Sequence, residues 1–211
     1  MVKRKHDTRW MAGVALTAAI VILLANTPLG MVPLPITKAT TVHVPVILGA
    51  IVFGPTAGMI LGGVFGICSV ISNTLTPSLT SFAFSPFMST TGLSGAVKAL
   101  WISVGCRILI GLVAACLWII LKKVKVPNYI ALPVTGFVGA MTNTVCVMGS
   151  IYLLLGQQYA EAQNEAMSAL MGIIMGTVTL NGIPEALAAM VLVTAIGMAL
   201  LRFTRAGKSA V

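Results

Sequence analysis

Long apolar runs separated by short polar segments dominate this sequence. Apolar residues make up 58% of the 211 positions, whereas charged residues make up only 8%. A soluble domain carries about 25% charged residues, so this chain has too little polar surface to cover an apolar core. We therefore expect one membrane domain, residues 1–211, with room for roughly six spans of about 20 residues each.

Turn and loop signals divide the apolar runs. The prolines and the glycine in 27–41 exclude a regular helix there. Asn181-Gly-Ile-Pro184 splits the last run, because Asn favours a helix cap and Pro the first turn. Residues 167–180 are then a separate apolar piece, and the alternative is one long helix kinked at Pro184. The expected spans are 10–26, 42–53, 57–73, 95–121, 129–155 and 182–203.

The positive charges indicate the orientation of the spans. The net charge is +9, and ten of the thirteen Lys and Arg residues lie in three clusters just outside apolar runs. With six spans, all three clusters fall on one side, and loops that stay cytoplasmic are rich in Lys and Arg. We therefore expect an all-α bundle of six transmembrane helices with both termini in the cytoplasm, and no nucleic-acid binding. The clusters are Lys3, Arg4, Lys5 and Arg9; Lys122, Lys123 and Lys125; and Arg202, Arg205 and Lys208.

A few polar residues interrupt the apolar segments. A charge in hydrocarbon costs about 3 kcal/mol even on mild insertion scales, so such residues tend to face a protein interior or a wet cavity. Arg107 and Glu185 are expected to border a pocket, to form a structural ion pair, or both. His43 could instead cap a helix, and Lys38 could face water. The candidate substrate-binding residues are Arg107, Asn143, Asn181, Glu185, His43, Lys38 and Asn73.

Motifs for catalysis and metal binding are missing from the sequence. It contains no P-loop, no HExxH, no GxSxG and no paired catalytic carboxylates. The four cysteines are scattered, without CxxC or Cys/His spacing. We therefore expect no enzyme, no catalytic residue, no metal site and no cofactor held by this chain.

Small residues recur at helical spacing on two of the expected spans. Gly58, Gly62 and Gly66 are four residues apart, and Ala15 and Ala19 repeat this spacing, with Ala12 one turn earlier. Such spacing lets two helix backbones approach closely. For the glycines we favour packing inside the bundle. For the alanines, internal packing and contact with a second membrane subunit are both open.

Several motifs, in this order, resemble the substrate-binding S components of energy-coupling factor transporters. The motifs are Thr41-Val-His-Val-Pro-Val-Ile-Leu-Gly-Ala-Ile-Val-Phe-Gly-Pro-Thr-Ala-Gly58, Gly62-Gly-Val-Phe-Gly66, Cys106-Arg-Ile-Leu-Ile-Gly-Leu112, Gly139-Ala-Met-Thr-Asn-Thr144 and Asn181-Gly-Ile-Pro-Glu185. The resemblance covers nearly the whole chain. It implies a six-helix vitamin-capture subunit in the plasma membrane of a prokaryote.

The resemblance also implies partners. In this family a separate membrane coupling subunit and two ATPase subunits drive import, so ATP is used by the partners. Ala15 and Ala19 match the AxxxA pattern that contacts the coupling subunit, and 27–41 matches the loop that acts as a substrate gate. The missing P-loop fits this division of labour.

Within the family, the pantothenate type is the nearest resemblance. Arg107 could bind the carboxylate in bidentate fashion, with Lys38 or His43 assisting. Asn143, Asn181 and Glu185 could bind the amide and hydroxyls. Riboflavin, folate and hydroxymethylpyrimidine are the alternative substrates. In other classes, a self-contained secondary transporter, for which no inverted repeat is evident, and a membrane scaffold are the alternatives.

Overall fold

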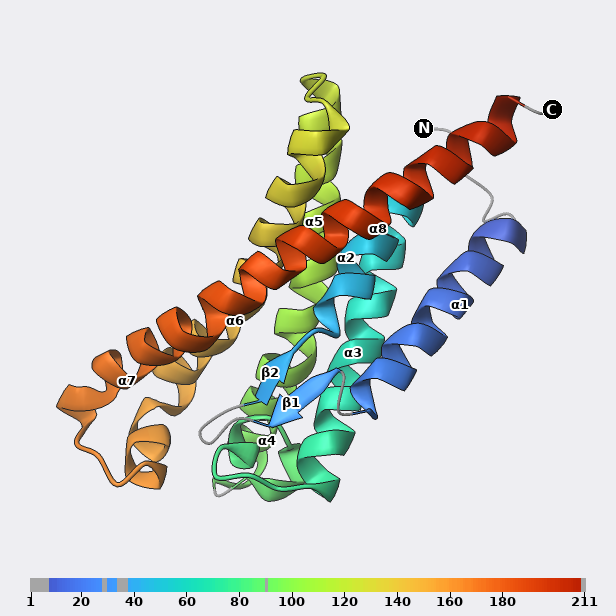
Figure 1. Ribbon diagram of the computed structural model, residues 1–211. Helices are drawn as coiled ribbons and strands as arrows, with labels where there is room; N and C mark the ends of the chain where they lie inside the picture. Colours follow the sequence, from blue (N-terminus) through green and yellow to red (C-terminus); the bar gives the residue numbers. More distant parts are fainter. Residues whose placement is uncertain (1–7, 28–29, 34–37, 90, 210–211) are drawn as a thin grey trace.

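The computed structural model describes residues 8–27, 30–33, 38–89 and 91–209, and for 31–33, 38–39 and 203–209 it describes the backbone alone. Helices make up nearly all of the described chain, with one short hairpin (Figure 1). The elements are α1 Thr8–Ala25, β1 Met31–Pro33, β2 Lys38–Thr40, α2 His43–Phe53, α3 Pro55–Leu75, η1 Ser81–Ala83, η2 Pro86–Met88, α4 Gly92–Leu100, η3 Trp101–Gly105, α5 Cys106–Lys123, α6 Asn128–Ala162, η4 Met167–Ala169, α7 Leu170–Thr177, η5 Val178–Gly182 and α8 Ile183–Ser209.

Five helical segments are long and apolar enough to cross a membrane. They are 8–25, 55–75, 92–123, 128–162 and 167–202. The remaining expected span, 42–53, corresponds to α2, whose 11 residues reach only about 16 Å at 1.5 Å per residue, roughly half of a hydrocarbon core. The expected all-helical membrane bundle is therefore present, with one helix too short for a full crossing.

For the last apolar stretch the structure agrees with the alternative that the sequence left open, one continuous helix. We expected a helix to begin near 182 and 167–180 to be a separate piece, but α7 passes through η5 into α8 without leaving helical geometry. The five residues of η5 form a π-helical turn immediately before Pro184. A π turn rearranges the hydrogen bonds that proline would otherwise break, so the helix continues past it.

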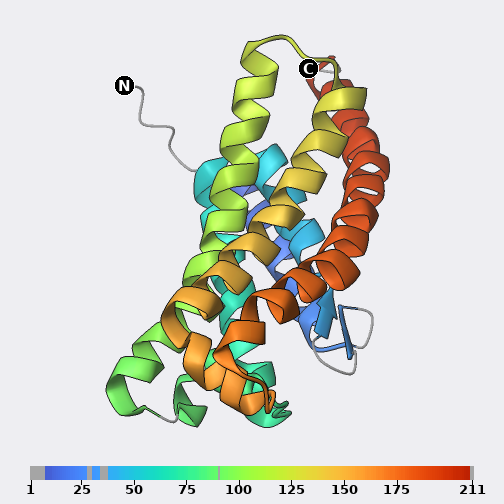
Figure 2. The ribbon, with the colours of Figure 1, turned by 90° about the vertical axis from the view of Figure 1, so that its left-hand side faces the viewer.

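The segment 27–41 contains a hairpin that the sequence reading did not include. Strands β1 and β2 pair antiparallel, with Met31 opposite Thr40 and Pro33 opposite Lys38. The hairpin lies at the end of the bundle that carries α4 (Figure 1). The first turn of α1, the linker between α5 and α6, and the last turns of α8 lie at the opposite end (Figures 1 and 2). Of the basic clusters, the described members, from Arg9, the 122–125 linker and the last turns of α8, therefore lie at one end of the bundle; Lys3, Arg4 and Lys5 lie outside the described residues.

Helix α2 occupies the centre of the bundle. It packs against α1, α3, α5, α6 and α8, and nine of its eleven residues are buried. Helix α8 runs along α6, and α3 runs along α5 (Figure 2). A short apolar helix thus serves as the core around which the longer helices pack.

The glycine stripe on α3 packs directly against the backbone of α5. A Cβ atom on Gly62 would collide with the carbonyl oxygen of Arg107, and one on Gly58 would lie 2.6 Å from the carbonyl oxygen of Gly111. A Cβ atom on Gly66 would lie 2.6 Å from the Cα atom of Val104. The prediction of close packing inside the bundle is confirmed for these glycines.

This contact predicts different outcomes for two adjacent glycines. Gly62→Ala should force α3 away from α5 and destabilise the chain by about 1–3 kcal/mol, the usual cost of overpacking. Gly63→Ala is the matched control, because its Cβ atom would meet only Ile108 Cγ1 at 3.9 Å. Thermal unfolding in detergent measures both variants, and equal unfolding midpoints would contradict the packing argument.

Candidate functional site

Four of the predicted substrate-binding residues line one cavity. Arg107 comes from α5, Asn143 from α6, Asn181 from η5 and Glu185 from α8. The cavity measures about 80 Å³. Its remaining lining residues are Thr40, Phe84, Thr144, Val147, Met148, Thr177 and Gly182. Three regions far apart in sequence, α5, α6 and the η5–α8 junction, thus bring their polar side chains to one point inside the bundle.

Arg107 is a buried cation held by aromatic rings and a backbone carbonyl. Its side chain is 6% exposed, and its Nη1 atom donates a hydrogen bond of 2.6 Å to the carbonyl oxygen of Ile102. The guanidinium carbon lies 5.3 Å from the ring centroid of Phe65 and 5.2 Å from that of Phe84. Cation–π contacts of this kind are attractive but do not neutralise the charge.

Two π-helical turns adjoin the site. The first, η3, ends at Gly105, two residues before Arg107, and the second, η5, contains Asn181. Such turns replace the regular hydrogen-bond ladder locally and are frequent at functional sites. The Ile102 carbonyl that binds Arg107 lies within η3. The irregular turn thus supplies an acceptor for the buried cation.

Glu185 binds the hairpin rather than Arg107. Its Oε1 atom accepts a hydrogen bond of 3.1 Å from the backbone N–H of Thr40. Across the described residues, no ion pair joins Arg107 to Glu185. The structural ion pair that the sequence left open is therefore not formed, and Glu185 instead connects β2 to α8.

Several buried polar atoms around this site have no hydrogen-bond partner. Buried polar groups are almost always paired in native proteins, so such a concentration marks a place where a bound molecule or water completes the pairing. Arg107 offers its unpaired Nε–H as a donor, and Asn143 offers its amide oxygen as an acceptor. The unpaired atoms here are Thr40 Oγ1, His43 Nδ1, His43 Nε2, Arg107 Nε and Asn143 Oδ1.

Of the other predicted substrate residues, His43 and Asn73 do not line the central cavity. His43 is buried and lines a separate cavity of about 200 Å³ that also contains Thr40 and Glu185. It makes no side-chain cap at the start of α2. Asn73 donates to the Ser69 carbonyl and accepts from the Ser81 hydroxyl, so its amide holds the 74–92 segment against α3. Lys38 belongs to β2, and its side chain lies outside the described part of the chain.

Thr40 and Phe84 are site residues that sequence reasoning missed. Thr40 lines the central cavity, the His43 cavity and a third cavity of about 60 Å³ beside Asn73. It belongs to the 27–41 segment, whose gate-like character was the available signal. Phe84 follows η1 and covers Arg107, and nothing in its local sequence marked it. Thr144 was marked only by its place beside Asn143.

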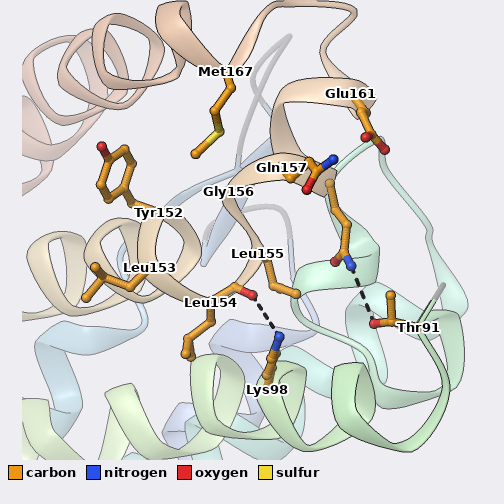
Figure 3. A pocket seen from close by; sticks show the side chains of 11 residues that line it. Thr91, Lys98, Tyr152, Leu153, Leu154, Leu155, Gly156, Gln157, Glu161 and Met167 are labelled. Carbon is orange, nitrogen blue, oxygen red and sulfur yellow. Dashed lines mark hydrogen bonds between the residues drawn. The ribbon is translucent and has the colours of Figure 1, made fainter.

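A larger cavity of about 570 Å³ lies beside a kink in α6 and contains none of the described predicted residues. The kink is at Leu155, with φ −133° and ψ 17°. Lys98 donates a hydrogen bond of 3.0 Å to the Leu154 carbonyl (Figure 3). Gln158 reaches the Thr91 hydroxyl at 3.5 Å. The ammonium group of Lys98 in this larger cavity is thus bound to a backbone carbonyl, whereas the Nε–H of Arg107 in the central cavity is unpaired.

The alanines of α1 are exposed, as a contact surface requires. Ala12, Ala15 and Ala19 all lie on the outside of the bundle, whereas Val14 and Val21 are buried. No group of three metal-ligating side chains occurs within the described residues. The exposed alanines leave the prediction of a partner contact open.

Comparisons with known proteins agree with this architecture. Residues 9–197 match the family model for the substrate-specific component of ECF transporters. The chain belongs to this family. It is also 34% identical to the pantothenic acid transporter PanT of Lactococcus lactis subsp. cremoris (strain MG1363) over 184 residues, which cover 87% of each chain. The predicted resemblance is confirmed, and this S component is a membrane protein of a transport system.

The hydrogen bond from the Thr40 N–H to Glu185 should hold β2 against α8, and hydrogen exchange at Thr40 can test this. Glu185→Ala removes the acceptor, and a hydrogen bond contributes about 1 kcal/mol, so exchange of the Thr40 amide hydrogen should accelerate roughly fivefold. Hydrogen exchange read by mass spectrometry measures this in detergent. Glu185→Gln keeps an oxygen acceptor and should exchange nearly as the parent does. Unchanged exchange of the Thr40 amide in the alanine variant would show that this hydrogen bond does not hold β2.

Proposed function

We propose that this S component binds pantothenate and delivers it to an importer built with a separate coupling subunit and two ATPase subunits. The chain itself holds no cofactor, and ATP is used by the partners. Binding occurs on the outer face of a prokaryotic plasma membrane, at the end of the bundle that carries the hairpin, with both termini in the cytoplasm. The similarity to a pantothenic acid transporter supports the substrate.

The observation that carries the substrate assignment is the buried, unneutralised Arg107. An unpaired buried charge is costly, and a carboxylate ligand would offset that cost. Because Nη1 already donates a hydrogen bond to the Ile102 carbonyl, the edge of the guanidinium that carries Nε is the part left for a carboxylate. Arginine binds a carboxylate through two parallel hydrogen bonds when one such edge is free.

The remaining lining fits the rest of pantothenate. Asn143 has an unpaired amide oxygen for an N–H or O–H of the ligand, and Asn181 and Glu185 border the same space. Phe84 is the one aromatic residue lining this cavity in the described chain. A flavin ring is commonly held between aromatic faces, so this lining favours a small flexible acid over riboflavin.

The cavity must widen to accept a vitamin. Its volume of about 80 Å³ is below the range of about 300–1,000 Å³ usual for ligand sites. Thr40 borders the central cavity, the cavity beside Asn73 and the His43 cavity. An outward movement of β2 would therefore join the three cavities. The hairpin, held by Glu185, thus fits the role of the gate over the site.

The substrate assignment is tested by titrating the purified chain with a panel of vitamins. Pantothenate should bind, and Arg107→Ala should weaken its binding by at least about 30-fold, because losing one partner of a buried charge pair costs about 2 kcal/mol or more. Arg202→Ala, which alters an exposed cation, is the control and should bind normally. Binding of riboflavin, folate or hydroxymethylpyrimidine in its place would keep the transport role but overturn the substrate.

The partner assignment is tested by blocking the alanine surface of α1. Ala15→Trp or Ala19→Trp should leave pantothenate binding intact and abolish uptake by cells that contain the whole importer, because only the subunit contact is obstructed. Ile120→Trp on α5, which is 57% exposed, should leave both unchanged. Loss of binding in the alanine variants would place these residues in the bundle, and uptake by cells lacking all partners would support a self-contained transporter.

A further inference from the structure

We propose that the hydroxyls of Ser69 and Thr80, together with Arg107, bind the carboxylate of the ligand in the cavity of about 60 Å³ that they line, here termed the acid subsite. This inference rests on the proposed function, and it assigns the two ends of pantothenate to two adjoining cavities. The hydroxyl-bearing end then lies in the central cavity, which Asn143 and Glu185 line. Ser69 and Thr80 are thus the residues that favour an acid over an uncharged ligand.

The acid subsite is polar, buried and small. Ser69 belongs to α3, and Thr80 directly precedes η1. Ser69 is 2% exposed and Thr80 is 5% exposed. The volume of about 60 Å³ exceeds the roughly 15 Å³ that one water molecule needs, but it is far below the roughly 300 Å³ at which usual ligand sites begin. The subsite therefore has room for a carboxylate group but not for a whole vitamin.

The hydroxyls of Ser69 and Thr80 are available to a ligand. The carbonyl oxygen of Ser69 accepts a hydrogen bond from the Asn73 amide, and that of Thr80 accepts one from the N–H of Ala83. Within the described residues, neither side-chain hydroxyl takes part in a hydrogen bond. Buried polar groups are almost always paired in native proteins, and a carboxylate accepts hydrogen bonds at about four positions. The two hydroxyls and the unpaired Nε–H of Arg107 would together satisfy most of these positions.

Charge favours this orientation of the ligand. Glu185 lines the central cavity, and two carboxylates that share a site disfavour each other. The described lining of the acid subsite contains no Asp or Glu, and Arg107 borders both cavities. A carboxylate in the acid subsite therefore gains the attraction of Arg107 without lying against Glu185. The hydroxyls of the ligand match Glu185 instead, because its carboxylate accepts hydrogen bonds.

One ligand can reach both cavities at once. Thr40, Phe84 and Arg107 line the acid subsite and the central cavity alike, so the two spaces meet beside these residues. The ring centroids of Phe65 and Phe84 lie 5.3 Å and 5.2 Å from the guanidinium carbon, and the two rings limit its movement. A flexible acid would therefore extend past a fixed cation, from the carboxylate in the acid subsite to the hydroxyls in the central cavity.

Titration of the purified full chain with pantothenate and with pantothenol, in which a hydroxymethyl group replaces the carboxylate, tests this assignment. Ser69→Ala and Thr80→Val should each weaken pantothenate about tenfold or more, the usual effect of losing a hydrogen bond to a charged group. They should weaken pantothenol about threefold or less, because hydrogen bonds between neutral groups are weaker. Thr80→Ser should restore most of the affinity lost in Thr80→Val. Ser72→Ala is the control and should bind normally, because Ser72 lies on α3 but does not line the acid subsite.

A variant in the central cavity tests the other end of the ligand. Asn143→Ala should weaken pantothenate and pantothenol equally, because both carry the same hydroxyl-bearing end. A loss confined to pantothenate in this variant would place the carboxylate in the central cavity and overturn the acid subsite.

The remaining outcomes separate this inference from the proposed function. Parental binding of pantothenate by Ser69→Ala and Thr80→Val would overturn the acid subsite and leave the proposed function in place. Equal losses for the acid and the alcohol in these two variants would do the same. A parent chain that binds another vitamin but not pantothenate would overturn the proposed substrate and, with it, this inference.

Discussion

The backbone contact between α3 and α5 determines where the buried cation, Arg107, lies. Gly62 leaves no side chain between its own helix and the carbonyl of Arg107. Phe65 follows Gly62 by three residues and so points to the same side of α3. Its ring therefore lies beside the guanidinium, at 5.3 Å from the guanidinium carbon. A larger residue at the glycine would shift both helices and separate the ring from the charge.

Irregular helical turns supply the polar groups of the site without opening the helices. In a membrane every backbone polar group needs a partner, so a break in a spanning helix is costly. The π turns η3 and η5 keep the chain helical and still change the regular pattern of backbone hydrogen bonds. One exposes the Ile102 carbonyl to Arg107, and the other brings Asn181 to the cavity.

Much of the site could be predicted because polarity is rare in this chain. Arg107, Asn143 and Glu185 stood out against apolar neighbours, and a polar residue within a span tends to face a protein interior or a wet cavity. The structure brings them to one cavity. The same argument placed His43 among them, but His43 lines a neighbouring cavity, which it shares with Thr40 and Glu185.

The remaining features depend on contacts that local sequence does not encode. Phe84 reaches Arg107 because Asn73 and Ser81 hold its segment against α3. Thr40 reaches Glu185 because β2 pairs with β1, and the two partners of that bond are 145 residues apart. The local sequence at Pro184 left open whether a new helix starts or one helix continues, and the preceding π turn, which accommodates the ring, is not encoded in that local pattern.

Helix α1 has three faces with different surroundings, and this separates their tasks. Val14, Val21 and Ala25 face the bundle, a second face borders an apolar cavity of about 580 Å³ between α1, α2 and α8, and Ala12, Ala15 and Ala19 face outward. None of the residues that line the substrate cavity belongs to α1. A partner acting on α1 would therefore reach the site through β1 and β2, which lie between α1 and α2 in the chain and end at the Thr40 bond to Glu185.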